Sequence, residues 1–125
     1  MNALATATNA YGRAQMAART PRGIEYEVIA RITHRLKSAI ETRKAQYAAF
    51  VSALNDNRQL WLTLGLDVAA EGNQLPKQLR AQLFYLFEFT DQHTRKVLAG
   101  EAEPDILIDI NLSVMRGLRG LGAPG

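Results

Sequence analysis

The sequence predicts an all-α protein: a single-domain antiparallel helical bundle of about four to five helices. Apolar residues recur at steps of three and four through most of the chain, the spacing of helices with one buried face. No alternation of polar and apolar residues is long enough for a strand, and the nearest, ILIDI at residues 106–110, has neighbours that favour helix. With 125 residues, 47% apolar and 22% charged, the chain is expected to fold as one domain, residues 1–125, without internal repeats.

The first expected helix, at about residues 3–18, is rich in alanine and weakly held. Alanine favours helix, but the stripe of Leu4, Thr8, Tyr11 and Ala18 offers too little apolar area to hold it firmly. Residues 1–19 are therefore expected to need a surface on which to dock, and residues 20–118 are expected to form the helical core.

A strong helix is expected from Thr20 and Pro21, because the hydroxyl caps a bare amide and Pro fits the first turn. Its outward face carries Arg31, Arg35, Lys37 and Arg43. Its inward face carries Ile24, Val28, Ile29, Ile32, Leu36, Ala39 and Ile40. A short turn is expected at residues 41–45, where the apolar stripe lapses.

The next helix has the alternating three- and four-residue steps of a bundle seam. The seam residues are Tyr47, Phe50, Leu54, Asn57, Trp61, Leu64 and Val68. The segment EGNQLP at residues 71–76 is expected to end this helix. Gly and Asn relax the backbone there, and Leu75 is pushed from helical angles by Pro76.

Pro76 is expected to open a further helix, with Gly100 as its C-terminal stop. Its inner stripe consists of Leu79, Leu83, Leu86, Thr90, His93 and Val97, broadened by Phe84, Phe87 and Leu98. A last helix begins near Pro104 with Asp105 in its first turn, where a carboxylate suits the helix dipole. The glycine-rich run from Gly117 is expected to fray, leaving residues 119–125 as a flexible tail.

These periodicities predict a core shared by all the main helices. Its members are Ile32, Leu36, Leu54, Trp61, Leu64, Leu83, Leu86, Ile110 and Val114.

The inventory of reactive residues favours neither catalysis nor metal binding. Cysteine is absent, which excludes disulfides and thiolate chemistry and fits a cytoplasmic protein. His34 and His93 are the only histidines, and no carboxylate recurs at a ligand spacing beside both. Asp67 and Glu71 fit solvated charges at a helix end better than an acid–base pair. We expect no catalytic residues, no cofactor, no metal, no membrane-spanning segment and no enzymatic activity.

Charge is distributed unevenly along the chain. The formal net charge is +3, yet residues 1–47 contain eight lysines and arginines against three acids. A basic helix face most often serves solubility, but it also suits an acidic partner or RNA.

Candidate binding residues lie between Asn57 and His93. Asn57 occupies a seam position one turn before the only tryptophan, Trp61, so the pair forms either a satisfied core anchor or part of an open groove. The aromatic residues from Phe84 to Phe89 spread over more than one helix face, so a core cannot easily take them all. Aromatics beside arginine are typical of interaction hot spots. The candidate partner-binding residues are Asn57, Trp61, Arg80, Phe84, Tyr85, Phe89 and His93.

Four segments, in this order, resemble the FlaF family of small flagellar biosynthesis regulators. They are TPRGIEYEVIARITHRL, LNDNRQLWLTLGLDVA, NQLPKQLRAQLFYLFEFTDQHTRKVLAGE and DINLSVMRGLRG, which together cover residues 20–120. The resemblance implies a cytoplasmic, non-enzymatic factor needed for flagellin synthesis or secretion. It also implies flagellin as a direct partner, in the manner of a secretion chaperone, and a functional connection to the regulator FlbT.

Two mechanisms remain open at this stage. A chaperone or adaptor would shield an amphipathic flagellin helix in an apolar groove. Alternatively, Arg31, Arg35 and Lys37 would contact the phosphates of flagellin mRNA and regulate its translation. The sequence favours the first, because the aromatics lie in the later half of the chain and the basic residues in the front half. Oligomeric state does not follow from the sequence.

Overall fold

A computed structural model of the chain describes the backbone of residues 26–122 and the side chains of residues 26–117. It contains four helices: α2 (Tyr26–Glu41), α3 (Tyr47–Ala69), α4 (Lys77–Leu98) and α5 (Asp105–Gly122). Residues 26–122 contain no strand, so the predicted all-α fold is confirmed. The predicted helix at residues 3–18 and the start signal at residues 20–21 lie outside the described residues.

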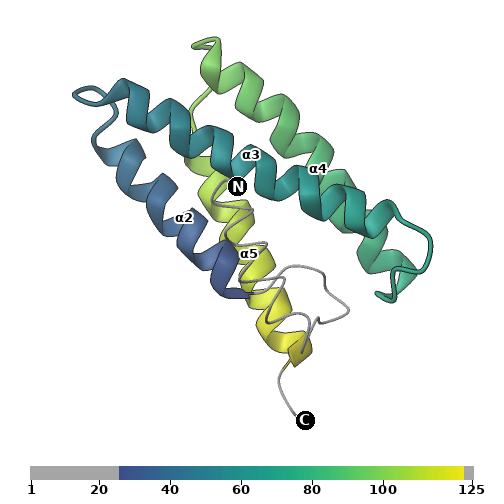
Figure 1. The fold of residues 1–125 in the computed structure, drawn as a ribbon. Coiled ribbons are helices and arrows are strands. Elements are labelled where there is room, and N and C mark those ends of the chain that lie inside the picture. Colours follow the sequence, from purple (N-terminus) through teal and green to yellow (C-terminus); the bar gives the residue numbers. More distant parts are fainter. Residues whose placement is uncertain (1–25, 123–125) are drawn as a thin grey trace.

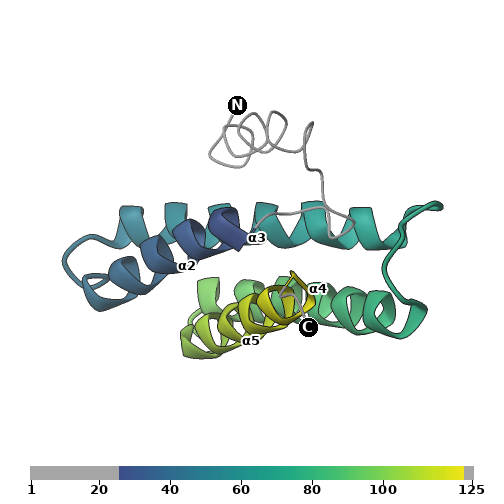
Figure 2. The same ribbon diagram turned by 90° about the horizontal axis from the view of Figure 1, so that it is seen from below.

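The four helices form two layers (Figures 1 and 2). Figure 2 shows α2 and α3 in one layer and α4 and α5 in the other. Across the layers, α2 packs against α5 and α3 packs against α4; α2 also packs against α3. The α4–α5 contact is the smallest of the four helix pairs, and Figure 1 shows these two helices separating away from the loop that joins them.

Two apolar clusters fill the interior. One lies near the α2–α3 and α4–α5 loops and contains Leu36, Phe50, Leu54, Val97 and Leu107, among others. The other lies toward the open end of the α4–α5 hairpin and is the larger. It contains Val28, Ile29, Ile32, Leu60, Trp61, Leu64, Val68, Leu75, Leu83, Ile110 and Val114. All the predicted core residues are buried except Leu86, which is only half-buried because it lies where α4 and α5 separate.

The helix ends follow from local sequence. The predicted turn occupies residues 42–45, and α4 starts directly after Pro76, whose carbonyl accepts the amide of Arg80 at 2.9 Å. Gly100 adopts a φ of 77°, which glycine tolerates without strain. The amide of Glu101 donates to Lys96 O at 2.8 Å and that of Gly100 to Val97 O at 3.0 Å, a Schellman end to α4.

Two local expectations are wrong. Tyr47 is 54% exposed, because it is the first residue of α3 and lies at the edge of the turn, with its ring 5.8 Å from that of Phe50. Helical structure was expected to be lost from Gly117, but α5 continues to Gly122. Each helical glycine costs only about 1 kcal/mol relative to alanine, which is too little to stop a helix that packing has already nucleated.

An ion-pair network on the surface ties α3 to α4. Arg58 Nε donates to Asp91 Oδ1 at 2.8 Å, and Arg95 donates to Asp91 Oδ2 from the next turn of α4. Burial raises the pKa of Asp91, but the hydrogen bonds and positive charges of Arg95 and Arg58 outweigh it and leave the pKa below its ordinary value of 3.8.

This network predicts a small pH dependence of stability. Because the folded-state pKa of Asp91 is depressed, the carboxylate stabilises the fold above pH 3.8 and loses that contribution as the pH falls through the folded value. Both arginines are partly exposed, so we expect at most about 1 kcal/mol. In urea unfolding, the free energy of unfolding should fall less between about pH 6 and pH 3 for Asp91→Asn than for the parent. The exposed Asp109→Asn is the matched control, and equal pH profiles for both variants would refute the assignment.

Candidate functional site

Asn57 and Trp61 lie in the interior, not at an open groove. Their exposed fractions are 0% and 2%. Trp61 Nε1 donates to Asn111 Oδ1 at 2.8 Å, and Asn111 Nδ2 donates to Asn57 Oδ1 at 2.7 Å and to Thr33 Oγ1 at 3.0 Å. The groove interpretation of Asn57 and Trp61 is therefore wrong, and the core-anchor interpretation is correct.

This buried polar network joins three helices. Thr33 comes from α2, Asn57 and Trp61 come from α3, and Asn111 comes from α5. The hydroxyl of Thr33 also donates to the carbonyl of Ile29 at 2.6 Å, which orients its oxygen to accept from Asn111. Polar groups that hydrogen-bond to one another in an apolar core fix the relative positions of the helices that carry them. Asn57 Nδ2, by contrast, is buried and has no hydrogen-bond partner among the described residues. The network is a structural element.

The aromatic residues of α4 divide between the core and the surface. Phe84, Phe87 and Phe89 are half-buried against the larger apolar cluster, and the rings of Phe84 and Phe87 lie 5.5 Å apart. Tyr85 is 65% exposed, as the surplus of aromatics on this helix predicted. Of the seven candidate residues, Tyr85 is the one that offers a large exposed aromatic surface.

His93 and Arg80 have different surroundings. His93 lies near the α4–α5 loop, where its ring stacks on Phe89 at 5.5 Å and its Nε2 donates to Glu103 O at 2.7 Å. Arg80 is half-buried, and its Nε has no hydrogen-bond partner within the part of the chain that the structure describes. The seven candidate residues are thus dispersed over the interior, the loop end and the outer face of α4, and the structure does not gather them into one site.

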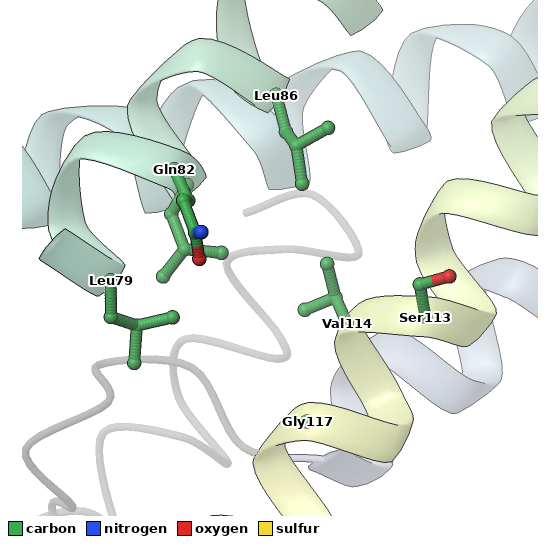
Figure 3. A pocket seen from close by; sticks show the side chains of 7 residues that line it. Leu79, Gln82, Leu86, Ser113, Val114 and Gly117 are labelled. Atoms are coloured by element: carbon green, nitrogen blue, oxygen red, sulfur yellow. The ribbon is translucent and has the colours of Figure 1, made fainter.

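The surface feature best suited to binding is a groove between α4 and α5, which we call the α4–α5 groove (Figure 3). Its volume is about 340 Å³. The described residues that line it are Leu79, Gln82, Leu83, Leu86, Ser113, Val114 and Gly117. In Figure 3 the side chains of Leu79, Leu86 and Val114 point into the space between the two helices.

Helix geometry explains why the groove exists at this place. The α4 lining residues, at positions 79, 82, 83 and 86, share one face of a helix, and those of α5, at 113, 114 and 117, share another. The two walls lie far from the loop at residues 99–104, at the end where the hairpin opens. Ser113 and Gly117 are too small to reach across to the leucines, so a gap lies above Leu83 and Val114.

A second, shallower concavity adjoins the groove on the outer face of α4. It is lined by Gln78, Ala81, Gln82, Tyr85 and Leu86 and measures about 510 Å³. Gln82 and Leu86 line both features, so the exposed ring of Tyr85 extends the apolar wall of the groove. Leucines, a tyrosine, amides and one serine line the combined surface, a composition suited to recognising an apolar partner.

The described residues show little sign of other chemistry. Residues 26–117 contain no group of three or more His, Cys, Asp or Glu side chains placed to hold a metal ion. The groove's hydroxyl, Ser113 Oγ, accepts from Arg116 Nη2 at 3.1 Å. Within the part of the chain that the structure describes, no helix is long and apolar enough to cross a membrane.

The comparison with protein families decides the identity. The family model described as flagellar protein FlaF matches residues 7–118, most of the chain. The chain belongs to the FlaF family. Its role is therefore in flagellum assembly, and FlaF is not an enzyme family. Neither a curated protein nor a solved structure matches the chain.

Sequence reasoning missed half of the groove in this FlaF-family chain. It placed Leu79, Leu83 and Leu86 on the inner stripe of their helix, but it assigned no role in binding to Ser113 or Gly117. The available signal was the pair of small residues four positions apart on the last helix, next to the buried Val114. Small residues on a face opposite leucines indicate a gap only once the pairing of the helices is known.

Proposed function

We propose that this chain is a cytoplasmic chaperone or adaptor that binds flagellin through the α4–α5 groove and so promotes flagellin synthesis or secretion. One observation carries the proposal: a largely apolar groove lies between two helices of a FlaF-family protein. Flagellin, the partner that the family resemblance implies, has amphipathic terminal helices whose apolar stripes are exposed before polymerisation. A groove between helices is a common acceptor for such a stripe.

The size of the groove suits one face of a helix. Its α4 wall runs from Leu79 to Leu86, a rise of seven residue steps or about 10 Å along the helix axis. Two turns of a partner helix present about three apolar side chains over that length. Burying one such side chain stabilises a complex by about 1.5–3 kcal/mol, so loss of a single central contact weakens binding roughly ten- to a hundredfold.

The structure offers less support to the alternative, an RNA-binding regulator. Arg31, Arg35 and Lys37 are exposed on α2, but Arg35 is paired with Asp56 of α3 and also donates to Ser52 at 3.2 Å. The most exposed aromatic of the described residues, Tyr85, lies on α4, in the other layer of the bundle. Tyr47 is also exposed, but it is the first residue of α3 and does not lie on the face of α2 that carries the three basic residues. Nonspecific recognition of a single strand needs stacking and positive charge on one surface.

The proposal predicts that an acidic residue in the groove weakens flagellin binding. Leu79→Glu places a carboxylate among the leucines, while its position in the first turn of α4 suits the helix dipole and protects the fold. We expect the dissociation constant for unpolymerised flagellin to rise about tenfold or more, measured by titration calorimetry. Tyr85→Ala, at an exposed position, should weaken binding by a smaller factor.

The matched control is Leu66→Glu, the same exchange at a leucine of α3 that is 62% exposed and lies outside the groove. It should leave the affinity within about threefold of the parent. Binding to flagellin should also persist between low and high salt, because apolar docking is not driven by counterion release. Equal losses from Leu79→Glu and Leu66→Glu would reject the groove, and salt-sensitive binding of flagellin mRNA without flagellin binding would reject the chaperone.

A further inference from the structure

We propose that the N-terminal segment of this chain, residues 1–25, docks in the α4–α5 groove and covers it until a partner displaces it. The groove would then be a regulated site, with an intramolecular occupant that competes for the surface proposed above for flagellin. The docking of the segment rests on the groove and the chain alone. Only the identity of the partner that displaces it rests on the proposed function.

The starting point of α2 places the tether beside the groove. Val28 and Ile29, in the first turn of α2, pack in the same apolar cluster as Leu83 and Val114, the two buried residues of the groove. Figure 1 shows this first turn, in the darkest blue, beside α5. The chain that precedes Tyr26 therefore enters the fold at the end of the bundle where α4 and α5 separate.

The length of the segment is sufficient. A linker of the length of residues 19–25 can span up to about 23 Å, and the helix predicted at residues 3–18 would be about 24 Å long. The groove wall from Leu79 to Leu86 requires about 10 Å, so two turns of that helix fill it. The FlaF family model matches from residue 7, so most of the segment lies within the matched length.

The composition of the segment suits a weak, displaceable occupant. In the helix that the sequence predicts at residues 3–18, Leu4, Thr8 and Tyr11 would share one stripe among alanines, so its apolar face would be small. A free helix of this kind binds poorly. A tethered one experiences an effective concentration in the millimolar range, so a weak intrinsic affinity is enough to occupy the groove. A partner helix with larger apolar residues then displaces the segment, because it buries more apolar surface in the groove.

Disulfide crosslinking in the full-length chain tests this docking without any partner. The chain has no cysteine, so each introduced pair reports on one proximity only. Ser113→Cys places a thiol on the groove wall, and either Ala7→Cys or Ala14→Cys places one beside the stripe of the segment. The matched control is Ser38→Cys, another exposed serine, which lies near the far end of α2 from the groove.

We expect the better of the two Ser113 pairs to form an intrachain disulfide at least tenfold faster than the same segment cysteine forms with Ser38→Cys. Adding Leu4→Glu and Tyr11→Glu should reduce that rate to the control level. Equal rates for Ser113 and Ser38 would overturn the proposal. A crosslinked dimer in place of the intrachain product would overturn it in favour of a second copy in the groove. Because flagellin is absent from the reaction, these results are independent of whether the chain binds flagellin.

Discussion

Replacing Asn111 by alanine is expected to destabilise the fold by about 3–5 kcal/mol, a large part of the 5–15 kcal/mol that stabilises a typical domain. The side chain is fully buried and makes three hydrogen bonds at once. Without it, Trp61 Nε1 loses its acceptor and Asn57 Oδ1 loses its donor inside an apolar cluster. Each buried polar group left unsatisfied costs about 1–3 kcal/mol.

Urea unfolding and thermal melting measure this effect directly. The midpoint temperature should fall by roughly 10–20 °C. Asp109→Ala, at an exposed position two residues earlier on α5, is the matched control and should change stability by less than about 0.5 kcal/mol. A double variant, Asn111→Leu with Trp61→Phe, removes donor and acceptor together and should recover part of the loss. If Asn111→Ala unfolds with the same midpoint as Asp109→Ala, the network does not stabilise the bundle.

Alanine at Gly65 is expected to destabilise the fold even though alanine is the better helix former. Gly65 lies in the interior of α3 against α4, and a Cβ atom built there would approach Phe87 Cγ to 2.5 Å and Cδ2 to 2.7 Å. A ring held by the surrounding core has to move to accommodate it. Overpacking of this kind costs about 1–3 kcal/mol, which exceeds the gain of about 1 kcal/mol from helix propensity.

Gly117→Ala provides the opposite result in the same protein. Gly117 is also helical, but no described atom beyond its own stretch of helix lies within 4 Å of a Cβ atom built there. Its replacement should therefore stabilise the fold by about 0.5–1 kcal/mol through helix propensity. Urea unfolding of both variants should give free-energy changes of opposite sign. Two stabilising substitutions would show that Gly65 does not mark a close approach of α3 and α4.

The sequence predicted much of the fold because helix periodicity and helix ends are local properties. Spacing of three and four residues identified the buried faces of α2 and α3, and Pro76, Gly100 and Pro104 marked ends that the structure confirms. The sequence indicated only one part of the buried polar network. Asn57 stood at a seam position, which indicated either a satisfied core amide or a groove, but its partner Asn111 lies 54 residues away. No local pattern connects two residues at that separation.

The candidate site was harder to predict for the same reason. The composition of α4 showed a surplus of aromatics and correctly implied that one would be exposed, and Tyr85 is that residue. Which aromatics pack inward depends on where α3 crosses α4, and Phe87 packs there in the space left by the missing side chain of Gly65. Leu86 was assigned to the core because its helix face is apolar, and it instead lines a groove.

By itself, the sequence determined the all-α class, the four helices from α2 to α5, most of their buried faces and the resemblance to the FlaF family. Those properties depend on residue types at short spacings and on the order of segments along the chain. The tertiary structure alone decided that Trp61 and Asn57 belong to an interior network, and that Leu79, Leu86, Ser113 and Gly117 share a groove. A groove depends on the distance at which two helices separate. That distance is set by side chains from distant parts of the chain packing together, and no local spacing encodes it.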